Sequence, residues 1–161
     1  TIESWEIALN NNGPTILVLT RQNLKINQNK HRDDNQVKNG AYIIRDFENY
    51  DATILSSGSE IEIACEASEK LQSIHSKNVR VVSIPSFELF EKNIENYKSK
   101  ILGKKPIFGI EAGIINGWEK YVDPKNFIGM KSFGASGPYK DLYKHFDITS
   151  SNLINMIIKN L

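Results

Sequence analysis

The segment from residue 52 to residue 84, ATILSSGSEIEIACEASEKLQSIHSKNVRVVSI, constrains the fold more than any other part of the sequence. Two short runs in it, 52–56 and 79–84, are apolar on both faces, and apolar side chains recur at helical spacing between them. Consecutive strands of this kind, joined by a helical crossover, favour a parallel sheet that is covered by helices. The crossover is expected to be right-handed.

The helix of this unit should begin near Ser59, because Ser59 and Glu62 have the spacing of a capping box. Its buried face is predicted to carry Ile61, Ala64, Cys65, Ser68, Leu71 and Ile74. Cys65 is the only cysteine, and it is interpreted as an unreactive core residue and not as a reactive thiol. A single thiol excludes an internal disulfide and agrees with a reducing compartment, so the expected location is cytoplasmic.

The rest of the chain alternates between helical and strand patterns. Helices are predicted at 2–11, 87–93, 94–102, 116–122 and twice within 137–161, and strands at 15–20, 105–113 and 127–134. The last helix should have Ser150 or Ser151 as its N-cap and should bury Leu153, Met156, Ile157 and Leu161. Residues 23–41 are rich in Asn, Lys and Asp, which is typical of a solvated linker. The predicted fold class is therefore α/β, a three-layer arrangement of a mostly parallel sheet with helices on both faces.

The charge balance limits the partners. Lys and Arg total 20 and Asp and Glu total 19, so the net charge of +1 supplies no field that would attract nucleic acid or anionic lipid. With 40% hydrophobic and 24% charged residues, the composition is that of a soluble globular chain without a membrane span. The N-terminus has neither a methionine nor a signal peptide, and it begins inside a predicted helix. We therefore expect a fragment of a longer protein.

Two turns of small residues are candidates for anion binding. Residues 56–60, SSGSE, lie between a strand and a helix N-terminus, and residues 133–139, FGASGPY, precede another predicted helix. Neither has the spacing of a dinucleotide-binding or phosphate-binding loop, so tight turns are the favoured interpretation. Glu111 follows a predicted strand at the edge where open α/β sheets bind ligands, but it could equally cap the next helix. Both interpretations of Glu111 stay open.

The three histidines, His31, His75 and His145, lie far apart in polar surroundings and lack metal-ligand spacing. They are interpreted as surface residues, and His75 suits the C-terminal end of a helix. The neighbouring acids Asp33 and Asp34 are interpreted as a solvated pair in the linker, because no companion ligands have recognisable spacing. No catalytic residue and no metal ligand is predicted.

Arg21 follows the apolar run 15–20 directly, and a guanidinium at the end of a buried strand needs a partner. The sequence alone favours an ion pair with a linker acid such as Asp33 or Asp34. An anionic ligand is the other candidate, because a planar guanidinium binds carboxylate or phosphate through paired hydrogen bonds.

Five stretches, taken together, resemble a known family. They are LVLTRQN, ILSSGSEIEIACEASEKL, VRVVSIPS, EAGIINGWEKYV and GMKSFGASGP, which begin at residues 17, 54, 79, 111 and 129. In this order and at these spacings they resemble the carboxyl-terminal part of a transketolase, and the resemblance covers essentially the whole chain. It implies a transketolase C-terminal-domain fold, which agrees with the α/β class obtained from the periodicity.

The resemblance implies a transferase that moves a two-carbon ketol unit from a ketose phosphate to an aldose phosphate in the pentose phosphate pathway. Such enzymes are homodimers that use thiamine diphosphate and a divalent metal, Mg²⁺ or Ca²⁺. The family would divide the chain into the end of the pyrimidine-binding domain at 1–22, a linker at 23–41 and the C-terminal domain at 42–161. The catalytic, cofactor and metal residues of the family have no counterpart in these 161 residues, so the chain alone is expected to be inactive.

One functional residue of the family is carried over. The arginine of the family's Ser/Thr-Arg-Gln motif binds the phosphate of the sugar substrate, and Arg21 occupies that place in LTRQ. Two alternatives stay open. One is an autonomous small-ligand or interaction module that uses the 56–60 turn and Glu111, and the other is the C-terminal domain of another thiamine diphosphate enzyme, such as deoxyxylulose-phosphate synthase. The motif around Arg21 favours transketolase over the second alternative.

Overall fold

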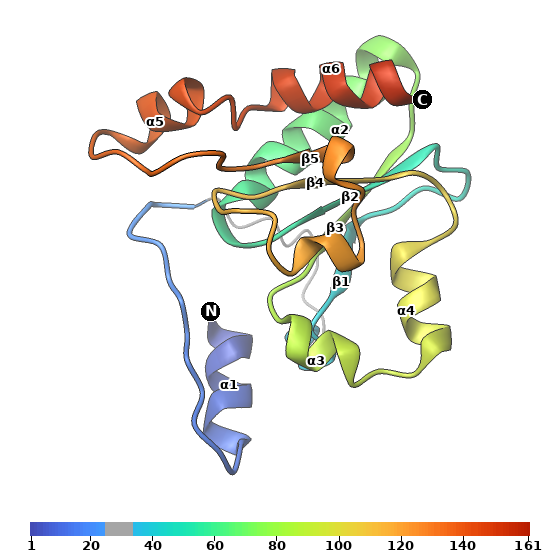
Figure 1. The fold of residues 1–161 in the computed structure, drawn as a ribbon. Coiled ribbons are helices and arrows are strands. Elements are labelled where there is room, and N and C mark those ends of the chain that lie inside the picture. Colours follow the sequence, from blue (N-terminus) through green and yellow to red (C-terminus); the bar gives the residue numbers. More distant parts are fainter. Residues whose placement is uncertain (25–33) are drawn as a thin grey trace.

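The computed structural model describes residues 1–24 and 34–161. Within these residues, five strands form one sheet in the order β1-β3-β2-β4-β5 (Figure 1). The strands are β1 (Tyr42–Arg45), β2 (Ala52–Ser56), β3 (Val79–Ser83), β4 (Ile107–Ile110) and β5 (Phe127–Ile128). The pairs β2–β3, β2–β4 and β4–β5 are parallel, whereas β1 pairs with β3 in the antiparallel sense at one edge. The predicted, mostly parallel sheet is confirmed.

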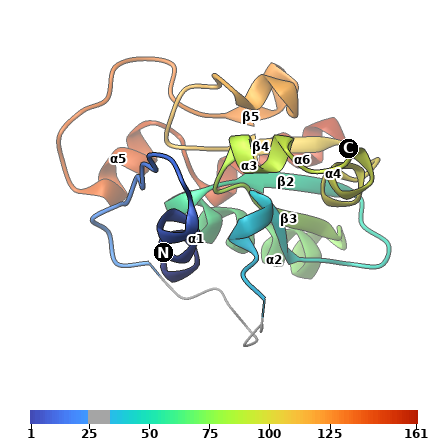
Figure 2. The same ribbon diagram turned by 90° about the horizontal axis from the view of Figure 1, so that it is seen from below.

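Helices cover both faces of this sheet, which confirms the predicted three layers (Figure 1 and Figure 2). The α-helices are α1 (Ile2–Asn10), α2 (Ile61–His75), α3 (Phe87–Glu91), α4 (Glu95–Leu102), α5 (Tyr139–His145) and α6 (Ser150–Asn160). Short 3-10 turns occur at η1 (Val37–Asn39), η2 (Gly58–Glu60), η3 (Trp118–Lys120) and η4 (Pro124–Asn126). Helices α2 and α6 pack together over one face, and α3, α4 and η3 lie over the other. None of the helices in the described ranges is long and apolar enough to cross a membrane.

The two central strands bury side chains on both faces. Ile54 and Val81 belong to the apolar cluster beneath α2 and α6, whereas their neighbours Leu55 and Val82 belong to the cluster beneath α3 and α4. This division follows from the pleat, because successive side chains of a strand point to opposite faces. Burying each of these side chains contributes roughly 1.5–3 kcal/mol relative to leaving it exposed. The continuous apolar runs of the sequence therefore mark strands that are covered on both sides, as predicted.

The start of α2 differs from the predicted capping box. Residues 58–60 form η2, the N-cap position is Glu60, and it makes no capping hydrogen bond through its side chain. The hydroxyl of Ser59 donates instead to Glu60 Oε1 at 2.6 Å. The capping box at Ser59 and Glu62 is therefore wrong, because Ser59 lies inside the 3-10 turn and not before the helix.

The buried face of α2 is close to the predicted one. Ile61, Ala64, Ser68 and Leu71 are buried, but Ile74, in the last turn of the helix, is 70% exposed. Cys65 is partly buried against the core. Burial, followed by the charge of Glu69, raises the pKa of the Cys65 thiol above its ordinary value, which disfavours the reactive thiolate.

The N-cap of helix α6 lies one residue before the first of the two predicted serines. Thr149 is the N-cap, and its hydroxyl accepts a hydrogen bond from the backbone nitrogen of Asn152 at 3.2 Å. Ser150 is already helical and buried, so the predicted serine cap is wrong. Leu153 and Ile157 are buried as predicted, whereas Leu161 is exposed at the chain end.

Two elements are shorter than the sequence pattern indicates. The predicted strand at 127–134 pairs with β4 over Phe127–Ile128 alone, and the predicted helix at 116–122 is the 3-10 turn η3. The pairing ends before Gly129, where the backbones approach closely: a Cβ on residue 129 would lie 2.6 Å from the carbonyl oxygen of Gly113. The backbone nitrogen of Met130 then donates to that same oxygen at 2.8 Å.

Residues 15–20 do not form the predicted strand. Ile16 is 88% exposed and Val18 is 92% exposed, and the described residues supply no neighbouring strand for this segment. A strand is stable only when its backbone groups pair with another strand, so an apolar pattern alone cannot produce one. Helix α1 forms as predicted but buries none of its residues.

The described part of the predicted linker, residues 34–41, is folded. It contains η1, and Val37 and Ala41 are buried. The carboxylate of Glu3 accepts hydrogen bonds from the backbone nitrogens of Gln36, at 2.8 Å, and Val37, at 3.1 Å, so α1 packs against this turn. Strand β1 follows directly and was not predicted. Residues 25–33 of the predicted linker lie outside the described residues.

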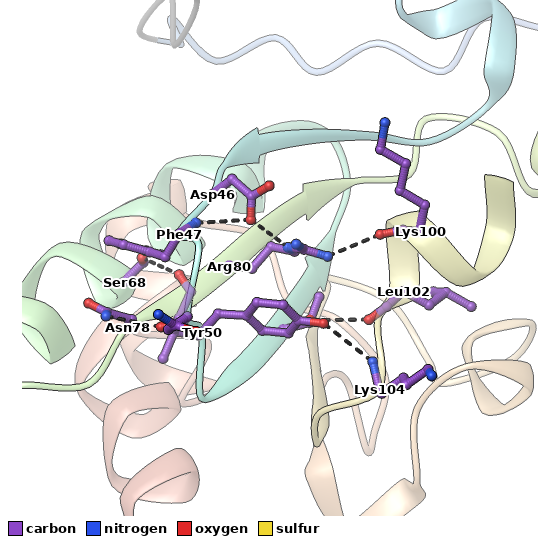
Figure 3. A network of polar contacts seen from close by, with 12 residues as sticks. Asp46, Phe47, Tyr50, Ser68, Asn78, Arg80, Lys100, Leu102 and Lys104 are labelled. Atoms are coloured by element: carbon purple, nitrogen blue, oxygen red, sulfur yellow. Dashed lines mark hydrogen bonds and ion pairs between the residues drawn. The ribbon is translucent and has the colours of Figure 1, made fainter. Parts of the chain in front are cut away.

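Arg80 connects β3 to both neighbouring segments at the amino end of the sheet (Figure 3). Only 8% of the residue is exposed. Its Nε lies 2.7 Å from Oδ1 of Asp46, its Nη1 donates to the carbonyl oxygen of Lys100 at 3.0 Å, and its guanidinium stacks 4.0 Å from the centre of the Tyr50 ring. One side chain thus joins β3, the loop after β1 and the end of α4.

Candidate functional site

Arg21 lies in the turn that follows the extended segment 15–20. With Thr20, Gln22, Asn23 and Tyr139 it lines an open hollow of about 520 Å³. Among the residues that the structure describes, no carboxylate forms an ion pair with Arg21. Asp34, one of the two acids considered as its partner, lies 3.8 Å from Lys38 Nζ, and Asp33 lies outside the described residues. Within the described ranges, the exposed Arg21 guanidinium thus lines the hollow without a carboxylate partner.

Hydrogen bonds on its two sides define the turn that carries Arg21. The hydroxyl of Thr20 accepts from the backbone nitrogen of Gln22 at 3.2 Å, a local bond that closes the turn. The side-chain nitrogen of Gln22 lies 3.5 Å from the phenol oxygen of Tyr143 in α5. The turn thus contacts the C-terminal region of the chain, more than a hundred residues away in sequence.

Tyr143 belongs to a partly buried polar cluster at the carboxyl ends of β2 and β4. Its hydroxyl donates to Glu60 Oε1 and lies 3.0 Å from Ser59 Oγ. Ser57 donates its hydroxyl to Glu111 Oε2 at 2.7 Å, and the carboxyl groups of Glu60 and Glu111 hydrogen-bond to each other. Because β2 and β4 are adjacent parallel strands, the residues that follow them meet at one edge of the sheet.

Glu111 keeps its proton at neutral pH. Burial, reinforced by the neighbouring charge of Glu60, raises the pKa of Glu111 from its ordinary value to about 8. Glu60 is only 2% exposed, so solvent cannot separate the two carboxyl groups. Burial and the hydrogen bond to Glu60 also raise the pKa of the Tyr143 phenol, which keeps that hydroxyl a donor.

Of the two interpretations of Glu111, the helix cap is wrong. Glu111 accepts hydrogen bonds from the hydroxyl and the backbone of Ser57, and the N-cap of the following turn η3 is Gly117. The turn at 56–60 does bind a carboxyl group, but this group is the chain's own Glu111 side chain. The sequence pattern did not indicate Glu60 or Tyr143. The one available signal for Glu60 was its place shortly after β2, because residues that follow adjacent parallel strands, such as Glu111 after β4, meet at the same edge of the sheet.

The remaining sequence candidates lie away from this cluster. His75 ends α2 and His145 ends α5, and both are exposed, as interpreted. His31 lies outside the described residues. The loop before α5 is exposed throughout, and Pro138 is the N-cap of that helix. Within residues 1–24 and 34–161, no three His, Cys, Asp or Glu side chains come together as a metal site.

Replacing Glu111 by glutamine tests the raised pKa of its carboxyl group. Between pH 4.5 and about 8 the folded chain keeps a proton that the unfolded chain releases, so the free energy of unfolding should fall as the pH rises through this window. Glu111→Gln keeps a neutral hydrogen-bonding side chain, so its stability should vary less with pH and should exceed that of the wild type at pH 8 by about 2 kcal/mol. Urea unfolding at pH 5.5 and pH 8 measures both quantities. Glu119→Gln, at an exposed position, is the control and should follow the wild type.

Comparison with known proteins identifies the family of this fold. The family described as the transketolase-like C-terminal domain matches residues 40–149, more than half of the chain. The chain belongs to the transketolase family. The resemblance inferred from the five sequence stretches is confirmed, and the region 40–149 contains the sheet and the Glu60–Glu111–Tyr143 cluster.

Relatives that are similar over nearly the whole chain are transketolases. The transketolase of Cereibacter sphaeroides is 41% identical over 156 residues, which cover 96% of this chain and 24% of the relative. That of Sinorhizobium medicae is 43% identical over 157 residues, which cover 96% of this chain and 23% of the relative. The chain therefore spans about a quarter of the length of these curated transketolases.

Solved transketolases have the same fold. The Campylobacter jejuni enzyme superposes with a TM-score of 0.87 at 37% identity, covering 98% of this chain and 24% of the solved chain. A transketolase of Pichia stipitis, solved in complex with sedoheptulose-7-phosphate, gives a TM-score of 0.70 at 30% identity and covers 75% of this chain and 18% of the solved one.

Proposed function

We propose that this chain serves as the carboxyl-terminal part of a transketolase, an enzyme that transfers a two-carbon ketol unit from a ketose phosphate to an aldose phosphate. The observation that carries the proposal is the exposed Arg21 guanidinium in LTRQ, at the edge of an open hollow and without a carboxylate partner in the described ranges. The similarity to transketolases along nearly the whole chain supports it, as does the sugar phosphate bound to the Pichia stipitis relative.

In this proposal Arg21 binds the phosphate of the sugar substrate. A guanidinium is planar and permanently charged, and it donates two parallel hydrogen bonds to phosphate oxygens. Hydrogen bonds to charged groups contribute roughly 1.5–3 kcal/mol each. The turn closed by Thr20 limits the directions in which the Arg21 side chain can extend.

The cofactor chemistry is assigned to other parts of a full-length enzyme. The residues in the described ranges do not fit a divalent metal, because no three potential ligands converge, and no step through thiamine diphosphate is assigned to this chain. Homodimer formation, a role in the pentose phosphate pathway and a cytoplasmic location belong to the same proposal. So do the boundaries at 1–22, 23–41 and 42–161. The absence of buried residues in α1 supports a boundary at which the first segment packs against another domain.

Replacing Arg21 by alanine in the full-length enzyme should weaken the use of phosphorylated substrates. The loss of the charge-assisted bonds should lower kcat/KM by about 30- to 200-fold, equivalent to about 2 to 3 kcal/mol. Steady-state kinetics with a phosphorylated ketose donor measures this effect. A ketol donor without a phosphate is the matched control, because its kcat/KM should change little. Equal losses with both donors, or no loss with either, would contradict the role of Arg21 in phosphate binding.

A further inference from the structure

The segment at residues 11–24 is connected to the folded domain by few contacts. Within the described ranges, one hydrogen bond joins these residues to the chain beyond residue 40, that from Gln22 Nε2 to the phenol oxygen of Tyr143. At 3.5 Å it is near the long limit of a hydrogen bond. Its strength therefore depends on how firmly Tyr143 is held.

Tyr143 is held from the opposite side by the polar cluster. Glu60, which is almost fully buried, accepts a hydrogen bond from the phenol, and Ser59 Oγ lies 3.0 Å from the same oxygen. Glu60 in turn hydrogen-bonds to Glu111 at the end of β4. Because Glu60 and Ser59 both contact the phenol oxygen, the phenol has a defined position and direction.

The direction of these hydrogen bonds determines whether the phenol oxygen of Tyr143 can accept a hydrogen bond from Gln22. A phenol can donate one hydrogen bond, and Glu60 accepts it. The lone pairs of the phenol oxygen are then free to accept the Gln22 side-chain amide. The donor–acceptor chain therefore runs from Gln22 through Tyr143 to Glu60, and it ends on the rigid carboxyl edge of the sheet.

We propose that Tyr143 is a positioning residue, which transmits the fixed geometry of Glu60 and Glu111 to Gln22 and so holds Arg21 at the edge of the hollow. Arg21 immediately precedes Gln22, so fixing one side chain of this turn restricts the backbone of the other. The contact itself is independent of any ligand. Its consequence for substrate binding rests on the proposed function of Arg21.

A pair of tyrosine variants tests the contact. Tyr143→Phe removes the hydroxyl and keeps the ring, whereas Tyr121→Phe removes a phenol–carboxylate hydrogen bond to Glu91 on the opposite face of the sheet. In a ¹⁵N-labelled chain, Tyr143→Phe should move the Gln22 side-chain amide resonances to the positions of a free glutamine. It should also lower the backbone order parameters of residues 20–23 below about 0.6. Tyr121→Phe should leave both unchanged. Unaltered Gln22 resonances and order parameters in Tyr143→Phe would overturn the proposal.

The functional consequence is tested in the full-length enzyme. Tyr143→Phe should raise the KM for a phosphorylated donor about 3- to 10-fold and leave kcat and the phosphate-free donor unchanged. In an Arg21→Ala background the same substitution should have no further effect, because the two residues act in series. An undiminished effect in that background would overturn the positioning role. If Arg21→Ala itself has no effect, the proposed function fails, whereas the resonance measurement still decides the contact.

Discussion

Gly40→Ala is expected to lower the free energy of unfolding by about 4 kcal/mol, the largest effect of any single substitution considered for this chain. Gly40 has φ of 73°, a left-handed conformation that costs an alanine roughly 1–2 kcal/mol. A Cβ there would lie 2.1 Å from the backbone nitrogen of Phe90 and 2.4 Å from the carbonyl oxygen of Ser86. Because these atoms belong to the backbone of α3 and its cap, the helix would have to move as a unit.

Gly58→Ala is the matched control for this prediction. Gly58 has φ of 51°, but a Cβ there would meet no atom within 4 Å, so the variant should lose about 1 kcal/mol through backbone strain alone. Thermal unfolding followed by circular dichroism should give a fall of about 10 °C for Gly40→Ala and of about 3 °C for Gly58→Ala. Similar losses in the two variants would mean that the contact between Gly40 and α3 is loose.

Arg80→Met is the second large prediction, with an expected loss of about 3 kcal/mol. Methionine keeps much of the apolar stem, but it removes the ion pair with Asp46, the hydrogen bond to the carbonyl oxygen of Lys100 and the stacking on Tyr50 (Figure 3). Asp46 is half exposed and can hydrate after the change, so the loss should remain below that of a fully buried ion pair. Because the hydrogen bond to Lys100 is lost, hydrogen exchange should increase most at the end of α4.

Arg45→Met provides the comparison. Arg45 is also a strand arginine with an aromatic contact, to Phe47 at 5.1 Å, but its guanidinium lies 3.9 Å from Glu69 at the surface. Surface ion pairs of this kind contribute about 0–1 kcal/mol, so the variant should lose no more than about 1 kcal/mol. Urea unfolding measures both free energies, and hydrogen exchange at residues 95–102 reports the connection to α4. Equal losses for the two arginines would contradict the structural role of Arg80.

The sequence pattern predicts the elements whose partners are close in the chain. The β2–α2–β3 unit follows from residues 52 to 84 alone, because the apolar runs, the crossover and the helical spacing all agree. Strand β1 is not predicted by the apolar pattern, because its residues are only partly buried and it pairs at the edge of the sheet. Residues 15–20 are predicted as a strand that does not form. Their apolar character indicates burial, but a strand also needs a neighbouring strand, which the apolar pattern cannot supply.

The candidate site is predictable in part for the same reason. Arg21 belongs to a local motif, so the sequence can indicate it, and Glu111 is indicated by its place at a strand end. Glu60 and Tyr143 become part of the site only when β2, β4 and α5 come together in the fold. These elements are separated by dozens of residues in the sequence, so no local pattern indicates the contact. A hydrogen bond such as Gln22–Tyr143 depends on side-chain positions that no periodicity encodes.

The exposed segment TILVLT, residues 15–20, has a consequence for the handling of the protein. Six uncharged, β-prone residues without proline or glycine form the kind of sequence that stacks into cross-β fibrils when it is left uncovered. Pro14 and Arg21 stand at its two ends, where a residue that cannot donate a ladder hydrogen bond and a repelling charge both oppose such stacking. In the separate chain, the arginine proposed to bind phosphate thus also acts as a gatekeeper against aggregation.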